Sequence, residues 1–211
     1  MAENFNSISE DRKKIILNAC IEEFAEKGYE RASTNNIVKK AGIPKGTLFY
    51  FFGSKKALYL YILEYAVAIF VKKFEAQSAD LSSDIFDRLL QRGLQKLKMG
   101  RDEPLLYQIV FSAFMNAPEK LKAEINEKFA GLRENASTLF DNIDTSGFRE
   151  NINLEKAVEI ISTLLEGVIN KYLSLFKNCK PGEALGIYDK LQTEVRHYFE
   201  ILKYGIYKSG Q

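Results

Sequence analysis

Residues 34–52 read TNNIVKKAGIPKGTLFYFF. The stretch predicts two short helices, over 35–41 and 45–51, on either side of a turn at Gly42, because glycine interrupts helices and supplies turn conformations. This spacing is typical of a helix-turn-helix, in which Ile37 and Val38 pack on Leu48 and fix the angle between the two helices. The second helix of such a pair places its N-terminal residues in the major groove of DNA.

The first residues of the second helix carry the groups that such a contact needs. Lys45 can reach a guanine edge or a phosphate, and Thr47 can donate to a phosphate or touch a thymine methyl group. Gly46 has no side chain, so the helix can approach the DNA backbone closely. The start of this helix is therefore the candidate recognition surface.

Four aromatic residues, Phe49–Phe52, follow directly. Since a helix turns by ~100° per residue, they cannot all be buried on one face. Leu48 and Phe52 are four residues apart and are expected in the core. Phe49, Tyr50 and Phe51 are then expected to point partly outward, towards a DNA backbone.

Charge is distributed unevenly along the chain. The 211 residues include 30 Lys and Arg, 28 Asp and Glu and one His, which gives a formal net charge of +2. Residues 31–63 contain no acid and six bases: Arg31, Lys39, Lys40, Lys45, Lys55 and Lys56. Without these six, the remaining chain has 24 basic against 28 acidic residues, a net charge of −4. Such segregation indicates a phosphate-binding face, although a solvated lysine-rich face would have the same composition.

Helical periodicity extends over the rest of the chain and predicts an all-α protein of nine, or at most ten, helices without strands. Residues 141–153 are rich in turn formers and are expected to be a loop. The expected helices cover 9–27, 35–41, 45–51, 55–77, 83–98, 103–116, 118–140, 154–177 and 181–207. Ile16, Ala19, Cys20 and Phe24 form the buried face of the first of them, and Ser33 or Thr34 is expected to cap the second.

Several functional classes are disfavoured by the composition. Two cysteines, Cys20 and Cys179, make neither a disulfide framework nor a zinc motif, and His197 alone supports no two-histidine metal site. We therefore expect no metal, cofactor or catalytic residue. The N-terminus does not resemble a signal peptide, and the apolar stretch 57–71 is interrupted by Glu64 and is too short for a membrane span, so a cytoplasmic location without membrane contact is expected.

A family resemblance rests on four stretches: ILNACIEEF at 16–24, AEKGY at 25–29, TNNIVKK at 34–40 and AGIPKGTLFYFFGSKKAL at 41–58. Together they resemble the DNA-binding domain of the TetR family of transcriptional regulators. The resemblance implies such a domain over 9–69, with its helix-turn-helix at about 33–52, and an effector-binding and dimerisation domain over 70–211. It further implies a homodimeric repressor that binds double-stranded operator DNA and is released by a small-molecule effector.

The resemblance also assigns roles to single residues. Thr34 and Asn35, at the start of the second helix, correspond to residues that often contact phosphate or base, as do Phe49 and Tyr50. Lys55 corresponds to a lysine that clamps a phosphate, a role that a helix N-terminus with an ammonium group supports independently. Three departures weaken single contacts. The family often has Tyr at the position of Phe49, Tyr or His at that of Phe51, and Ser at that of Pro44, where a side-chain cap is then lost.

The C-terminal half carries candidates for an effector site. An aromatic and thioether-rich helix is expected to hold either core residues or the wall of a ligand cavity. Two polar residues that interrupt a later apolar run are expected to meet a ligand, to lie at a dimer interface or to face solvent. The candidates are Tyr107, Phe111, Phe114, Met115, Glu166 and Asn170. The resemblance places the dimer interface in the last two helices, over 154–177 and 181–207.

The leading hypothesis is thus a repressor that binds a palindromic operator as a dimer and is released by a small, apolar or amphipathic effector. One alternative is a helical carrier or enzyme with a merely structural N-terminal module. It is disfavoured because no catalytic groups converge and because Cys20 lies on a predicted buried face, where a thiol is inert. A TetR-type activator is a further alternative with the same sequence features.

Overall fold

The computed structural model describes residues 3–76, 82–132, 143–177 and 184–205. Within these ranges every regular element is a helix, which confirms the predicted all-α class. None of these helices combines the length and the apolar character needed to cross a membrane.

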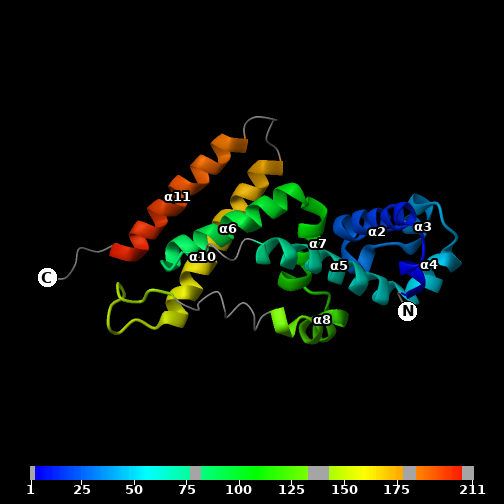
Figure 1. Ribbon diagram of the computed structural model, residues 1–211, viewed down its shortest axis with the longest axis horizontal. Helices are drawn as coiled ribbons and strands as arrows, with labels where there is room; N and C mark the ends of the chain where they lie inside the picture. The colour runs from blue at the N-terminus through cyan, green and yellow to red at the C-terminus, as the bar shows by residue number, and fades with distance from the viewer. Residues whose placement is uncertain (1–2, 77–81, 133–142, 178–183, 206–211) are drawn as a thin grey trace. The chain divides into compact units, whose positions relative to one another are not determined.

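The chain divides into two compact units (Figure 1). The first is drawn from Met1–Ala76 and Glu103–Ala136, and the second from Gln77–Asp102 and Ser137–Gln211. The first unit thus includes three helical elements that lie beyond residue 69, where the sequence suggested that the DNA-binding domain ends. The functional division at that point stays a prediction.

The first unit is built around α2, Glu10–Arg31, which packs against α3, α5 and α7. Ile16, Ala19, Cys20 and Phe24 are buried on it, as the periodicity predicted. Burial raises the pKa of the Cys20 thiol to about 12, so this thiol stays protonated. The backbone leaves the helical conformation at Gly28, whose φ is +67°, directly after residue 27, where the first helix was expected to end.

The remaining helices of this unit are shorter than α2, although α5 is nearly as long. They are α1 (Glu3–Asn6), α3 (Thr34–Ala41), α4 (Lys45–Phe52), α5 (Lys55–Glu75), α7 (Pro104–Met115), the 3-10 turn η1 (Glu119–Leu121) and α8 (Lys122–Lys128). Helix α1 has no counterpart among the predicted helices, because four residues are too few for a periodic pattern.

The prediction of one continuous helix over 118–140 is wrong for the residues that the structure describes. The chain instead forms η1 and then α8, which ends at Lys128. Phe129 leaves the helical conformation, with φ −110° and ψ 18°, and its buried ring packs edge-on against Phe114, with 5.6 Å between ring centroids. Residues 133–140 of the predicted helix lie outside the described residues.

The second unit consists of α6 (Ile85–Asp102), α10 (Leu154–Lys177) and α11 (Ala184–Tyr204). Its core joins apolar residues of all three helices, including Leu97, Leu165 and Val195. Helices α6 and α10 pack closely at Gly93, where an added Cβ would lie only 2.7 Å from Ile169 Cδ1. The bounds of α10 match the prediction, and residues 143–153 before it contain no helix, as expected.

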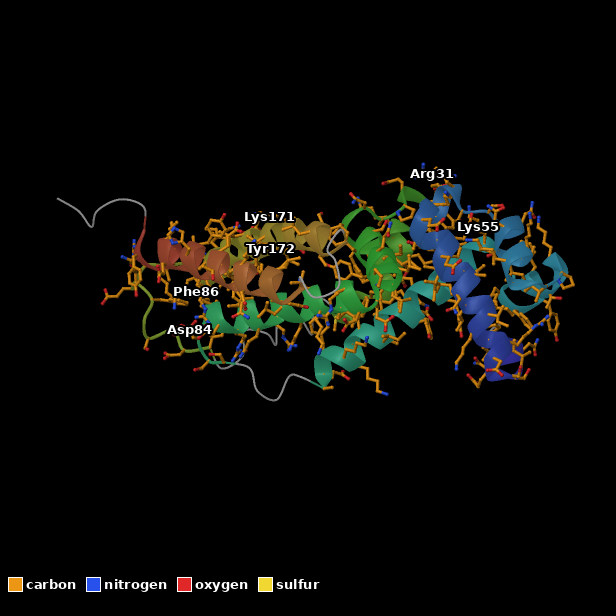
Figure 2. The ribbon with its side chains drawn as sticks, turned by 90° about the horizontal axis from the view of Figure 1, so that it is seen from above. Arg31, Lys55, Asp84, Phe86, Lys171 and Tyr172 are labelled. Carbon is orange, nitrogen blue, oxygen red and sulfur yellow. The ribbon has the colours of Figure 1, made fainter. Side chains whose placement is uncertain are left out.

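A network of polar side chains joins α10 to α11 around Glu194. Lys171 Nζ donates to both carboxylate oxygens, at 2.8 and 2.9 Å, and the hydroxyls of Tyr172 and Tyr198 each donate at 2.8 Å. The hydrogen bonds from Lys171, Tyr172 and Tyr198 lower the pKa of Glu194 from 4.5 to about 2. Figure 2 shows Lys171 and Tyr172 together on α10. The network therefore stabilises the folded state through the ionised form of Glu194.

Replacing Glu194 by Gln is expected to lower the free energy of unfolding at pH 7 by about 2 kcal/mol, because hydrogen bonds to charged groups contribute on this order. Since the pKa of Glu194 is lowered in the folded state, its stabilisation is present above pH 4.5 and is lost as the pH falls towards 2. The difference between wild type and E194Q should therefore narrow over that window in urea unfolding followed by circular dichroism. Glu200→Gln, at an exposed position on the same helix, should change stability by less than about 0.5 kcal/mol.

Candidate DNA-binding surface

The predicted helix-turn-helix is formed by α3, a glycine turn and α4. Gly42 adopts φ +62° and ψ 38°, and its N–H donates to the carbonyl of Val38. The N–H of Ile43 donates to the same carbonyl at 3.1 Å, and the Ile43 side chain is buried. The left-handed turn, which glycine adopts without strain, thus ends α3 and leads the chain into α4.

The N-termini of α3 and α4 are capped in different ways. Pro44 precedes α4 and offers only its carbonyl, which accepts from Thr47 N–H at 3.0 Å, so the side-chain cap is absent as predicted. The predicted cap on α3 is wrong, because Ser33 occupies the capping position without a side-chain hydrogen bond to the backbone.

The α3 cap comes instead from Glu23 of α2, a residue that the sequence analysis missed. Its Oε1 accepts from Ser33 N–H at 2.9 Å and from Asn36 Nδ2 at 3.3 Å, and its side chain is buried. A carboxylate at a helix N-terminus satisfies otherwise unpaired N–H groups and interacts well with the helix dipole. Its position could have identified it, since Glu23 follows Ile16 and Cys20 at helical spacing on the buried face of α2.

The side chains expected to meet DNA on α4 lie at its surface. Lys45 and Gly46 are exposed, Thr47 and Phe49 are partly exposed, and Tyr50 is 66% exposed. Lys45 Nζ lies 5.9 Å from the centroid of the Phe49 ring, within range of a cation–π interaction. A Cβ built at Gly46 would meet no atom within 4 Å, so the space in front of this residue is open.

The expectations for the aromatic run hold for all but one residue. Leu48 and Phe52 are buried in the core, as predicted. Phe51 was expected to point outward and is only 6% exposed, so that expectation is wrong. Its ring packs edge-on against Phe5 of α1, with 5.5 Å between centroids, and α1 was not foreseen.

Lys55 is the first residue of α5, directly after the capping Ser54, whose Oγ accepts from Ala57 N–H at 3.1 Å. Lys55 Nζ donates to the carbonyl of Glu30 at 3.0 Å and lies 5.0 Å from the centroid of the Tyr29 ring. Figure 2 shows Lys55 close to Arg31, at the end of α2. Because an ammonium group has three donors, the hydrogen bond to Glu30 does not prevent Lys55 from also binding a phosphate, and that contact stays a prediction.

Two of the six bases in the acid-free window are paired with acids from elsewhere in the chain. Lys40 lies 3.2 Å from Glu22 on α2, and Lys56 lies 2.8 Å from Glu124 on α8. The hydrogen bond from Lys56 to Glu124 and their charge attraction raise the pKa of Lys56. Across the described ranges, four bases of the window have no carboxylate within 4.0 Å: Arg31, Lys39, Lys45 and Lys55.

On α3, Thr34 is partly exposed and Asn35 is exposed, both in the first turn. Because α3 contacts α4 and α4 contacts α5, these two residues, the start of α4 and Lys55 all belong to one packed group of helices. This group has the geometry by which helix-turn-helix proteins present a helix to the major groove and add backbone contacts around it.

The family model for "Bacterial regulatory proteins, tetR family" matches residues 16–62. The matched segment belongs to the TetR family. It contains α3, α4 and the start of α5, so the match covers the candidate DNA-binding surface.

Similar proteins support this assignment. The uncharacterised HTH-type transcriptional regulator YerO of Bacillus subtilis is 24% identical over 166 residues, which are 78% of this chain and 56% of that protein. The chain thus spans just over half the length of this relative. A TetR-family regulator from Chloroflexus aurantiacus has a similar structure, with a TM-score of 0.70 at 19% identity over 95% of both chains. AibR, solved with isovaleryl coenzyme A and operator DNA, gives a TM-score of 0.63 at 16% identity over 87% of this chain and 96% of its own.

The effector candidates lie in different units. Four lie on α7 in the first unit, where the rings of Tyr107 and Phe111 stack at 6.1 Å and Met115 is exposed. Phe114 packs on Phe129 and is partly buried. Glu166 and Asn170 lie partly buried on α10 in the second unit. Their role in effector binding stays a prediction.

Replacing Glu23 by Ala is expected to lower the free energy of unfolding by about 1–3 kcal/mol, because the Ser33 N–H and the Asn36 amide lose their acceptor. Chemical denaturation measures this loss. The neighbouring Glu22→Ala is a matched control, because it removes only a surface ion pair with Lys40 and should cost less than about 1 kcal/mol. Equal losses in the two variants would contradict the capping role of Glu23.

Proposed function

We propose that this TetR-family protein is a transcriptional repressor that binds a palindromic operator through α3 and α4. The observation that carries the proposal is the surface position of Lys45–Thr47 at the start of α4, together with bases that have no carboxylate within 4.0 Å in the described part of the chain. A lysine and a threonine at the start of a recognition helix are suited to guanine edges, thymine methyl groups and phosphates.

The proposed contacts divide into two kinds. Lys45, Gly46 and Thr47 read base edges or lie against the DNA backbone in the major groove. Lys55, the partly exposed Thr34 and the exposed Asn35 position the protein on phosphates, and Phe49 and Tyr50 pack against the sugar–phosphate backbone. Phosphate contacts supply affinity that falls with salt, whereas base contacts supply specificity.

Replacing Lys45 and Lys55 together by Ala is expected to abolish binding to the duplex upstream of the protein's own gene, because each subunit loses one base or phosphate contact and one phosphate clamp. A gel-shift series at several salt concentrations measures the loss. Lys96→Ala with Lys98→Ala on α6 removes the same charge from exposed positions and should leave binding within about twofold, since surface charges away from the interface contribute little.

Undiminished binding by the Lys45 and Lys55 variant would refute the proposed surface. A reporter gene behind the same upstream region distinguishes repression from activation. Repression predicts that deletion of the regulator raises expression, and a fall in expression would instead identify an activator.

We propose that the protein acts as a homodimer formed through α10 and α11. Two helix-turn-helix units then bind half-sites about one DNA turn apart, which a single short recognition helix would bind weakly. The proposal is supported by Ile160 and Leu175 on α10, which are 56% and 48% exposed, since large apolar residues at the surface of a helix are typical of an interface.

Replacing Ile160 and Leu175 together by Asp is expected to convert the dimer into a monomer, because two charges per subunit would be buried in the interface. Native mass spectrometry measures the oligomeric state directly. Ile152→Asp is the matched control, because Ile152 is 47% exposed but precedes α10. A dimer that persists in the double variant would place the interface elsewhere.

We further propose that a small, apolar or amphipathic molecule releases the protein from DNA. The stacked Tyr107 and Phe111 on α7 are candidate contacts within the first unit, and the polar Glu166 and Asn170 on α10 are candidates within the second unit. AibR was solved with both isovaleryl coenzyme A and operator DNA, which supports an amphipathic effector for this chain by analogy. The same native mass spectra would reveal such a molecule as added mass on the purified protein.

An enzymatic role is not part of the proposal. Cys20 is fully buried and its pKa is raised to about 12, so its thiol is unsuited to nucleophilic attack at neutral pH. The family match covers a DNA-binding segment, and the relatives found are named as transcriptional regulators.

A further inference from the structure

The N-terminal helix α1 packs directly on the recognition helix. It contains four residues, Glu3–Asn6, and contacts α4. Figure 1 shows this blue segment beside α4 in the first unit. The contact is made by Phe5, whose side chain is fully buried although it lies close to the start of the chain.

Three aromatic rings from two helices surround Phe5. Its ring centroid lies 4.9 Å from that of Phe52 and 5.5 Å from that of Phe51, both on α4. It also lies 5.7 Å from the ring of Tyr61 on α5, which itself packs on Phe52 at 5.2 Å. Edge-to-face and tilted contacts at these distances are favourable for aromatic pairs. Phe5 therefore joins α4 to α5 from outside the helix-turn-helix.

The recognition helix depends on such support because it is short. Eight residues are too few for a helix to be stable by itself in water, so its position is fixed by what packs beneath it. In the described residues, the ring of Phe51 meets aromatic rings of α4 itself and, from any other element, only that of Phe5. The buried ring of Phe51, near the end of α4, thus packs on a side chain that the helix-turn-helix does not contain.

We infer that Phe5 is a positioning residue for operator recognition, which sets the orientation of α4 against its DNA. The inference rests on the proposed function. Tyr50 on α4 is 66% exposed, and the start of the same helix carries the exposed Lys45 and the partly exposed Thr47. A rotation of α4 that follows loss of the Phe5 ring displaces Lys45 and Thr47 from base edges together, whereas non-specific phosphate contacts tolerate the displacement.

The test compares binding of full-length wild type and Phe5→Ala to two duplexes, the region upstream of the protein's own gene and a scrambled duplex of equal length. Fluorescence anisotropy is measured well below the melting temperature of each variant. We expect Phe5→Ala to bind the upstream duplex at least about tenfold more weakly, as for loss of one base contact, and the scrambled duplex within about twofold. Phe5→Leu, which retains most of the apolar volume, should restore most of the lost affinity.

Phe129→Ala provides the matched control, because Phe129 is also a buried phenylalanine of the first unit but packs on Phe114 of α7. It should lower the melting temperature while leaving the ratio of the two affinities unchanged. An equal change of this ratio in Phe129→Ala would show a general effect of destabilisation and would overturn the inference. So would an unchanged ratio in Phe5→Ala. If wild type itself does not distinguish the two duplexes, the proposed function fails instead.

Discussion

The packing beneath α4 is the constraint on which the candidate surface depends. A helix of eight residues gains its stability from tertiary contacts rather than from its own hydrogen bonds. Leu48, Phe51 and Phe52 supply the apolar face for these contacts, and the remaining face is left for a partner. Because buried and exposed residues share one short segment, the same eight residues determine both the stability of the helix and the side chains that it exposes.

Helix α2 provides the second part of this support. Its apolar face forms the core of the first unit, and within that face a single carboxylate, that of Glu23, caps α3. The cost of burying a charged group is offset by two hydrogen bonds and by the N-terminal end of the helix dipole. The two short helices are thus fixed by different means, α3 by a polar contact from α2 and α4 by aromatic packing.

The distribution of charged residues along the sequence differs from their distribution in space. The acid-free window 31–63 indicates a basic surface, yet Glu22 and Glu124 approach two of its six bases from other helices. The pairs are exposed and contribute little to stability. Their consequence is local, because in the described ranges they leave Arg31, Lys39, Lys45 and Lys55 as the bases of the window without a carboxylate within 4.0 Å.

The sequence by itself determined the helical class, the helix-turn-helix and the family, because glycine turns, apolar periodicity and charge are local properties of a chain. It also predicted the burial of Leu48, Phe52 and Cys20, since their spacing defines one helix face. Only the tertiary structure decided that Phe51 is buried, that Glu23 replaces Ser33 as the cap of α3, and that the helix after Pro118 is interrupted at Phe129. Each of these three features depends on a contact with a residue distant in sequence. A periodic pattern of apolar residues does not show which distant side chain makes that contact. The physical reason is that burial and capping are satisfied by whichever group lies nearest in space.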